Sequence, residues 1–150
     1  MPTIHEEVTI SAPVERVFAV VHEDLPNAPK WTTHLKRAYP VDGEATGPGS
    51  RIRYDLELPG WKGHLELEQT TWSPGRRVAG EFVDGPLKGT WSYSYRRLKS
   101  GTKLVYDMDF QLGGVLRLLG GVLAREYAAG IRDNMTNLKA YVESGKGPRA

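Results

Sequence analysis

The segment from Gly89 to Leu112, GTWSYSYRRLKSGTKLVYDMDFQL, alternates large and small or charged side chains on both sides of a turn. Alternation with a period of two is typical of a half-buried strand, and Ser100–Gly101 predicts a tight turn, so the segment predicts an antiparallel hairpin. One face of this hairpin collects Trp91, Tyr93, Tyr95, Leu104, Tyr106, Met108 and Phe110. Such a face either fills a solid core or lines a cavity, and the two possibilities imply different functions.

The strand and turn pattern continues on the N-terminal side of this hairpin. Short connections rich in glycine and proline favour antiparallel neighbours. The predicted strands are Leu35–Asp42, Ser50–Leu58, Lys62–Trp72, Arg76–Val83, Leu87–Leu98 and Thr102–Leu112, after a first strand that carries Val8 and Ile10 on one face. A short helix is predicted from Pro13 onward, and a second short helical piece is predicted near Trp31.

Residues 114–144 predict one long amphipathic helix. A helix is only about 10–12 Å across, so it cannot fill the space inside a twisted seven-stranded sheet. Large side chains or a ligand must occupy the remaining space. The apolar face of the helix carries Leu116, Leu119, Leu123, Tyr127, Ile131, Leu138 and Tyr141.

This order of elements, with VTISAPVERVFAVV, Trp31, GSRIRY, SPGRRV and SGTKLVYDMDF, resembles the START-like or SRPBCC superfamily, and within it the polyketide cyclase/dehydrase and lipid-transport branch. The resemblance implies an α+β helix-grip (START-like/Bet v 1-like) fold. In that fold a curved seven-stranded antiparallel sheet wraps around a long C-terminal helix, with two short helices after strand 1. We expect a single START-like (SRPBCC) domain over residues 1–144 and a flexible tail over residues 145–150. The resemblance carries over no catalytic residue.

The alternation also predicts the residues that bind a ligand. A buried tyrosine hydroxyl without a partner costs about 1–3 kcal/mol, so several of them on an apolar concave wall indicate trapped water or a ligand with a few oxygen atoms. The predicted ligand-binding residues are Tyr54, Leu56, Leu67, Phe82, Trp91, Tyr93, Tyr95, Tyr106, Met108, Phe110, Leu123, Tyr127 and Ile131.

Polar and small residues interrupt the apolar face of the predicted helix. Asn134 is expected to satisfy a neighbouring backbone group, and Gly130 is expected to allow close packing. Gly113–Gly114 fit equally well with close packing or with a helix start that opens to admit a ligand. Glu126, at the border of the apolar face, is the acidic residue best placed for burial, although the sequence assigns it no catalytic role.

Composition excludes several classes of function. The chain of 150 residues has 20 basic and 18 acidic side chains, a balance that does not indicate a nucleic-acid or anionic-membrane partner. It has no cysteine, and His5, His22, His34 and His64 show no ligand spacing for a metal. We expect the histidines to face solvent and expect neither a metal nor another cofactor. No signal peptide or stable membrane insertion is predicted, so the expected location is cytoplasmic.

Three functions fit these observations. The first is binding or transport of a small hydrophobic ligand, such as a lipid or polyketide, between the sheet and the C-terminal helix. The second is a polyketide cyclase- or aromatase-like enzyme that uses the same cavity, and it needs an ionisable side chain inside. The third is a protein-interaction module of the chaperone-activator type, which needs an exposed apolar patch. The alternation favours the first, because it predicts mainly apolar and phenolic groups in the interior.

Overall fold

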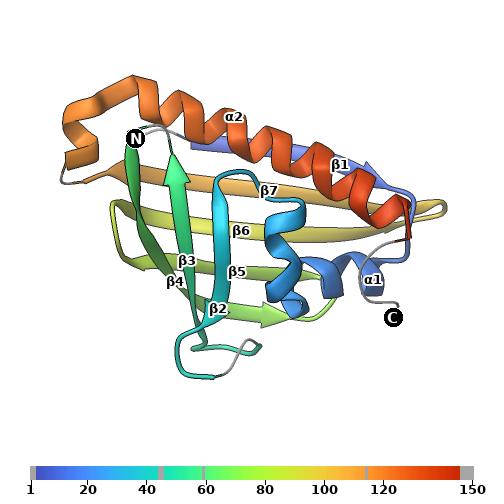
Figure 1. Ribbon diagram of the computed structural model, residues 1–150. Helices are drawn as coiled ribbons and strands as arrows, with labels where there is room; N and C mark the ends of the chain where they lie inside the picture. The colour runs from blue at the N-terminus through green and yellow to red at the C-terminus, as the bar shows by residue number, and fades with distance from the viewer. Residues whose placement is uncertain (1–2, 44–45, 59, 114, 146–150) are drawn as a thin grey trace.

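A curved antiparallel sheet and one long helix make up most of the molecule (Figure 1). The computed structural model describes residues 3–43, 46–58, 60–113 and 115–145, with side chains except at Trp61 and residues 115–124. Seven strands pair in the order β1-β7-β6-β5-β4-β3-β2. This confirms the predicted α+β helix-grip architecture. The strands are β1 (Thr3–Ile10), β2 (Leu35–Pro40), β3 (Arg51–Leu58), β4 (Trp61–Ser73), β5 (Arg77–Asp84), β6 (Leu87–Leu98) and β7 (Gly101–Leu112).

The β6–β7 hairpin has the predicted register and sets the interior face of the sheet. Trp91 lies opposite Met108, and Tyr93 lies opposite Tyr106. Gly101 follows the turn, where a Cβ would lie 2.1 Å from the carbonyl oxygen of Ile10. Only glycine therefore lets β7 begin this close to the end of β1.

Three short helical elements follow β1. The α-helix α1 (Val14–Phe18) passes into a π-helical turn, η1 (Ala19–Glu23), and then into a 3₁₀-helix, η2 (Leu25–Lys30). The helix predicted from Pro13 onward is α-helical only as far as Phe18 and continues as the π-helical turn. The four consecutive residues Ala19–His22 are all buried, so this turn is covered on every side and not along one stripe alone.

The long helix α2 (Val115–Glu143) crosses the open side of the curved sheet and runs beside β1 (Figure 1). Polar contacts hold it there: Lys139 Nζ donates to the carbonyl oxygen of Thr9 at 2.7 Å, and Arg16 Nη2 donates to the carbonyl oxygen of Val142 at 2.6 Å. None of the helices, over the residues that the structure describes, is long and apolar enough to cross a membrane.

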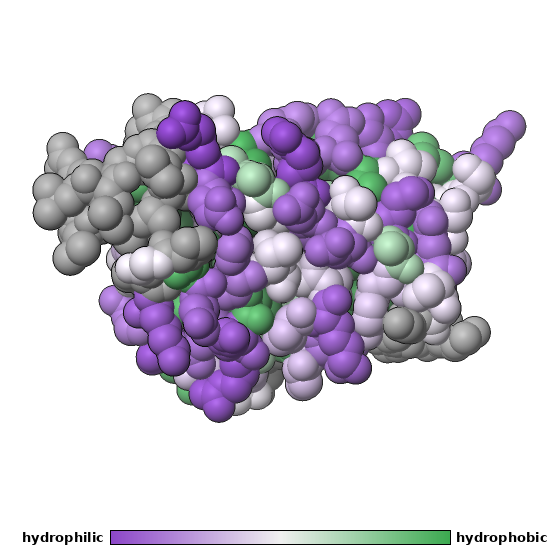
Figure 2. All heavy atoms as spheres, turned by 45° about the horizontal axis from the view of Figure 1, so that its top comes forward, coloured by the Kyte–Doolittle hydropathy of each residue, from purple (hydrophilic) through white to green (hydrophobic). Residues whose placement is uncertain are grey.

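The interior has two ends. At the end near α1, which we call the packed end, the side chains of Ile10, Val17, Leu104, Leu138 and Val142 are fully buried. At the other end the sheet, η2 and the middle of α2 surround a cavity. On the face seen in Figure 2, hydrophilic residues dominate the described surface and apolar residues are scattered among them.

Candidate functional site

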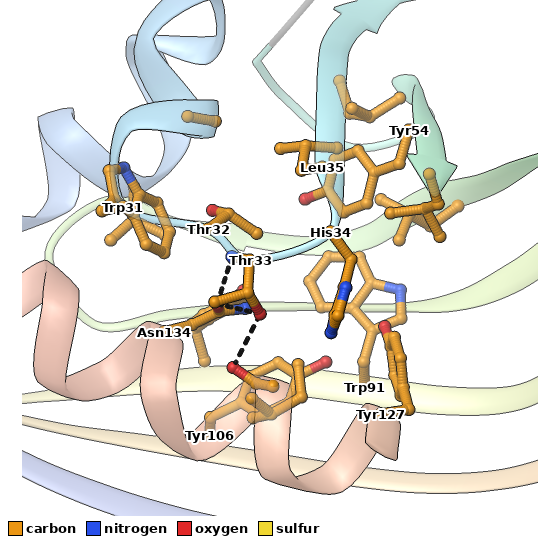
Figure 3. Close-up of a pocket in the computed structure, with 18 of the residues that line it drawn as sticks. Trp31, Thr32, Thr33, His34, Leu35, Tyr54, Trp91, Tyr106, Tyr127 and Asn134 are labelled. Atoms are coloured by element: carbon orange, nitrogen blue, oxygen red, sulfur yellow. Dashed lines mark hydrogen bonds between the residues drawn. The ribbon is translucent and has the colours of Figure 1, made fainter. Parts of the chain in front are cut away.

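The cavity lies between the concave face of β3–β7, the η1–η2 segment and α2 (Figure 3). Its volume open to the centres of water molecules is about 60 Å³. This is room for several water molecules. Leu25, Ile52, Leu58 and Met135 are among its apolar wall residues, and a few polar groups stand between them. The site is therefore small, partly open to the surface and mainly apolar.

Most of the ligand-binding residues predicted from the sequence line this cavity. The sheet contributes Tyr54, Leu56, Leu67, Phe82, Trp91, Tyr93 and Tyr106, and α2 contributes Tyr127 and Ile131. Tyr54 and Leu56 come from β3, and the facing pair of Tyr93 and Tyr106 comes from the β6–β7 hairpin. The side-chain alternation of the strands thus brings residues from distant parts of the chain to one wall.

Four nominated residues are placed differently. Tyr95, Met108 and Phe110 are buried but do not line the cavity. Met108 lies behind Tyr106, whose hydroxyl donates to its sulfur at 3.4 Å, and Phe110 packs behind the Tyr127 ring at 6.1 Å between ring centroids. Leu123 belongs to the residues whose side chains lie outside the described part of the structure.

Sequence reasoning missed the wall that comes from η1, η2 and the connection to β2. His22 lines the cavity from this side. Trp31, Thr33 and His34 line it as well (Figure 3). One signal was available for His22, because it follows Phe18 by four residues and therefore shares its face of a helix. No periodicity runs through residues 31–34, so the pattern offered no signal for the other three.

Four tyrosine hydroxyls gather around the cavity. Burial raises the pKa of Tyr54 to about 12 and raises the pKa values of Tyr93, Tyr106 and Tyr127 well above 10, with further increases from the neighbouring phenols. All four are therefore neutral near pH 7 and able to donate a hydrogen bond. The hydroxyls of Tyr54, Tyr93 and Tyr127 form no hydrogen bond with any described residue.

Two indole N–H groups at the cavity are buried without an acceptor. Trp31 and Trp91 are 5% and 6% exposed, and Nε1 of each has no hydrogen-bond partner among the described residues. An unsatisfied buried donor costs about 1–3 kcal/mol. The two indoles can only donate, and because water does not reach either nitrogen, each is a local cost of the packing around the cavity.

His22 is the polar residue between the cavity and the packed end. Its Nε2 shares a hydrogen bond of 2.7 Å with the Tyr95 hydroxyl, and its ring contacts Phe18 and Tyr93 at centroid distances of 4.8 and 5.0 Å. Burial among these rings lowers the pKa of His22 to about 3. The imidazole is therefore neutral near pH 7, and the prediction that it faces solvent is wrong.

Contacts between α2 and the residues before β2 close one side of the cavity. The backbone N–H of Thr33 donates to Asn134 Oδ1 at 2.6 Å, and the Thr33 hydroxyl donates to the carbonyl oxygen of Gly130 at 3.3 Å (Figure 3). This confirms that Asn134 satisfies a backbone group. It also confirms close packing at Gly130, where a Cβ would lie 2.9 Å from Thr33 Oγ1, although the partner is this connection and not the sheet.

His34 has an unusual backbone conformation at the cavity wall. Its φ angle is 63°, in the left-handed region, at a cost on the order of 1–3 kcal/mol for a residue other than glycine. Its carbonyl oxygen accepts from the N–H of Glu57 at 2.8 Å. Its Nε2 lies 3.5 Å from Glu126 Oε1, with 24% of the His34 side chain and 45% of the Glu126 side chain exposed.

The remaining two histidines lie on the outer face of the sheet. His5 is exposed and pairs with Glu7 and Asp107. His64 is partly exposed, its Nε2 lies 2.9 Å from Asp84 Oδ2, and together with Glu66 these side chains offer three possible metal-ligand atoms within 4.8 Å. Arg53 Nη1 lies 3.7 Å from Glu66 Oε2 and already supplies a positive charge there. The geometry is that of a surface ion-pair network.

The comparisons with known proteins agree with this architecture. The family model described as polyketide cyclase/dehydrase and lipid transport matches residues 1–143. The chain belongs to this family. No curated protein matches it.

Solved structures share the fold of this chain. DR_A0006 from Deinococcus radiodurans is 25% identical with a TM-score of 0.69, covering 97% of this chain and 99% of that one. A START superfamily protein from Mycobacterium smegmatis is 18% identical with a TM-score of 0.75, covering 96% and 99%. The di-domain ARO/CYC StfQ from the steffimycin biosynthetic pathway is 15% identical with a TM-score of 0.73, covering 95% of this chain and 51% of StfQ. The last two likenesses establish the fold alone.

Proposed function

We propose that this member of the family binds a small hydrophobic ligand in the cavity and sequesters or carries it. The carrying observation is the mainly apolar cavity wall, on which the hydroxyls of Tyr54, Tyr93 and Tyr127 stand without a hydrogen-bond partner among the described residues. In a fully packed core such hydroxyls carry an uncompensated cost, whereas a ligand with oxygen atoms pairs with them and removes it.

The shape of the cavity supports a compact ligand. Affinity comes from apolar area removed from water, at roughly 25 cal/mol per Å², while the donors set the orientation. About 60 Å³ of space for water centres suits a small ring system better than a long acyl chain. A larger ligand requires α2 or the η2–β2 connection to move outward.

The protein-interaction alternative has little support on the surface. Among the residues whose side chains are described, Val41 and Leu98 are the large apolar ones that are exposed, and they lie after β2 and at the β6–β7 turn. A docking face needs a contiguous apolar patch. The enzyme alternative rests on the family description and on ionisable groups at the cavity wall, which are taken up below.

The proposal is tested by ligand-dependent stability. Thermal unfolding is measured with a panel of fatty acids, sterols, polyphenols and cyclic ketones, and native mass spectrometry looks for a molecule retained from the expression host. A ligand at 100 times its Kd stabilises the fold by about 2.7 kcal/mol. If no compound in the panel shifts unfolding and no molecule is retained, the proposed function is refuted.

A matched pair of variants ties the effect to the cavity. Ala28 is buried in η2 and lines the cavity, whereas Ala129 is exposed on α2. Ala28→Leu should fill the space and remove the ligand-induced shift. Ala129→Leu adds the same atoms at the surface and should leave the shift intact. An equal response in both variants places the ligand elsewhere.

A further inference from the structure

An ionisable pair stands at the wall of the cavity. His34 lines it, and Figure 3 shows the imidazole reaching from the β2 side toward α2. Glu126, on α2, places Oε1 3.5 Å from His34 Nε2. With 24% of its side chain exposed, His34 faces the cavity and also has access to solvent. It can therefore exchange a proton with either side.

The position of Glu126 selects one of the two imidazole nitrogens. A carboxylate beside Nε2 favours the tautomer that carries the proton on Nε2, which leaves the lone pair on Nδ1. The arrangement has the chemistry of a general base held by an acidic neighbour.

His22 also lines the cavity but lacks these features. Its Nε2 is engaged with the Tyr95 hydroxyl, and the groups around it are the rings of Phe18, Trp72 and Tyr93. It is buried, with a pKa lowered to about 3 by that burial, so a proton taken up there would be poorly held. Of the two cavity histidines, His34 is the one suited to moving protons.

We propose that the protein also catalyses proton removal from carbon: His34 is the general base that acts next to a carbonyl group of a bound ligand, and Glu126 is its positioning residue. This inference rests on the proposed ligand binding. The carbonyl oxygen is held by the neutral donors of the cavity, namely the phenols of Tyr54 and Tyr127. These donors have no competing partner among the described residues.

The step balances without a further reactant. Nδ1 of His34 takes a proton from the α-carbon, the C–H electron pair becomes the C=C bond, and the carbonyl π pair moves to oxygen as an enolate. The hydrogen-bond donors stabilise the charge on that oxygen. The imidazolium then returns its proton to the α-carbon. For a ligand with a second carbonyl, the enolate α-carbon instead bonds to the carbon of that carbonyl, the first C=O re-forms, and the oxygen of the second carbonyl takes the proton from the imidazolium.

The backbone of His34 supports a role beyond packing. The left-handed conformation is fixed on one side by the hydrogen bond from Glu57 N–H to the His34 carbonyl oxygen, and on the other by the bond from Thr33 N–H to Asn134. These bonds hold the imidazole against the cavity in spite of an unfavourable φ. Strain of this kind concentrates at functional sites.

Exchange of α-protons for deuterium tests the inference directly. Cyclohexanone and 2-tetralone are incubated with the protein in D₂O, and loss of the α-proton signals is followed by NMR. Binding of each ketone is measured separately by tryptophan fluorescence, because Trp31 and Trp91 line the cavity. We expect wild-type protein to accelerate exchange at least tenfold over buffer.

The variants separate catalysis from folding. His34→Asn removes the base, and asparagine tolerates a left-handed φ, so the fold should survive while the acceleration is lost. His34→Gly is the second variant if the first unfolds. His5→Gln changes an exposed histidine on the outer face of β1 and should leave exchange unchanged. Glu126→Gln should lower the exchange rate severalfold without changing ketone affinity, and should shift the ¹⁵N signals of His34 toward the other tautomer.

The outcomes distinguish the two proposals. A ketone that binds but exchanges at the buffer rate, or equally fast with His34→Asn, overturns this inference and leaves ligand binding standing. If neither ketone binds, the inference falls as well, while the proposed function is judged by the panel of other ligands.

Discussion

Tyr93 and Tyr95 lie two residues apart on the same face of β6 and belong to different regions of the interior. The Tyr95 hydroxyl is paired with His22 at 2.7 Å, and its ring contacts Phe18 at 5.3 Å between centroids. Tyr93 stacks against Tyr106 at 4.7 Å, lines the cavity, and has no described hydrogen-bond partner. The same residue type in the same alternation is therefore structural at one position and part of the site at the next.

The difference arises from what covers the sheet. At the packed end α1, η1 and the last turns of α2 all lie against it, and Val17 and Leu138 are fully buried there. At the cavity end the cover is η2 and the connection before β2, which touches α2 through Thr33, Gly130 and Asn134. The connection before β2 is held to α2 by these hydrogen bonds and not by large packed side chains. Free space therefore remains between it and the sheet.

The largest expected effect is a loss of folding stability at acidic pH. His22 has a folded pKa of about 3 against an ordinary value of 6.5, so below pH 6.5 the unfolded chain binds a proton that the folded chain does not. The contribution of His22 to the free energy of unfolding is fully present above pH 6.5. Below that value it decreases by about 1.4 kcal/mol for each unit that the pH is lowered, until the folded pKa is reached. Between pH 6.5 and 4.5 we expect a loss of roughly 2–3 kcal/mol in the free energy of unfolding, measured by urea titration.

The control for this loss is His22→Gln, which removes the titrating group and should flatten the curve over that window. His5 acts in the opposite sense, because hydrogen bonds to Glu7 and Asp107 raise its pKa. His5→Gln should make the acid loss steeper. A steep loss that persists in His22→Gln would assign the acid sensitivity to another group.

The next effect compares the two tyrosines. Tyr95→Phe leaves the buried Nε2 of His22 without a partner and should lower the free energy of unfolding by about 1–3 kcal/mol. Tyr93→Phe removes a hydroxyl that no described residue bonds, and its cost should stay below about 0.5 kcal/mol. Equilibrium denaturation of both variants checks the contrast, and equal costs would show that the two regions are alike.

Added volume should separate the regions as well. Ala12, at the packed end, and Ala28, at the cavity, are both 6% exposed. Ala12→Leu forces extra atoms into a filled space and should cost about 1–3 kcal/mol, whereas Ala28→Leu should cost less than 1 kcal/mol. Thermal unfolding of the two variants without ligand measures this. A larger loss for Ala28→Leu would mean that the free space is not available to side chains.

The smallest effect on stability concerns the phenols themselves. The double variant Tyr93→Phe/Tyr106→Phe removes one hydroxyl without a described partner and one that contacts only the Met108 sulfur. The fold should lose less than about 1 kcal/mol, while the preference for ligands with oxygen atoms over pure hydrocarbons should weaken several-fold in binding titrations. A loss of several kcal/mol with unchanged preference would assign these hydroxyls to the core.

The fold was accessible from the sequence because strand alternation and helix periodicity are local signals. The β6–β7 hairpin, for example, has the register that its alternation predicts. The π-helical turn at Ala19–Glu23 was not accessible, because α and π turns share almost the same sequence preferences and only tertiary burial selects between them.

The site was accessible only in part, for a related reason. Alternation predicts which face of the sheet Tyr54, Trp91 and Tyr95 occupy, but not whether a helix fills the space opposite. Tyr95 shows the limit, since its position relative to η1 decides that it meets His22 and not the cavity. The wall at residues 31–34 depends on contacts with α2, which lies about a hundred residues further along the chain. The hydrogen bond from Thr33 N–H to Asn134 is an example.

The attachment of Lys139 to Thr9 also has a bearing on how copies of the protein behave together. β1 and β2 are the two outermost strands, and an outermost strand can recruit a strand from another molecule. At β1 one outward carbonyl is occupied by the Lys139 ammonium group beside the helix. At β2 the register is broken between Leu35 and Arg37, and Pro40 has no N–H to offer. Both borders thus discourage edge-to-edge pairing of the sheet with that of another copy.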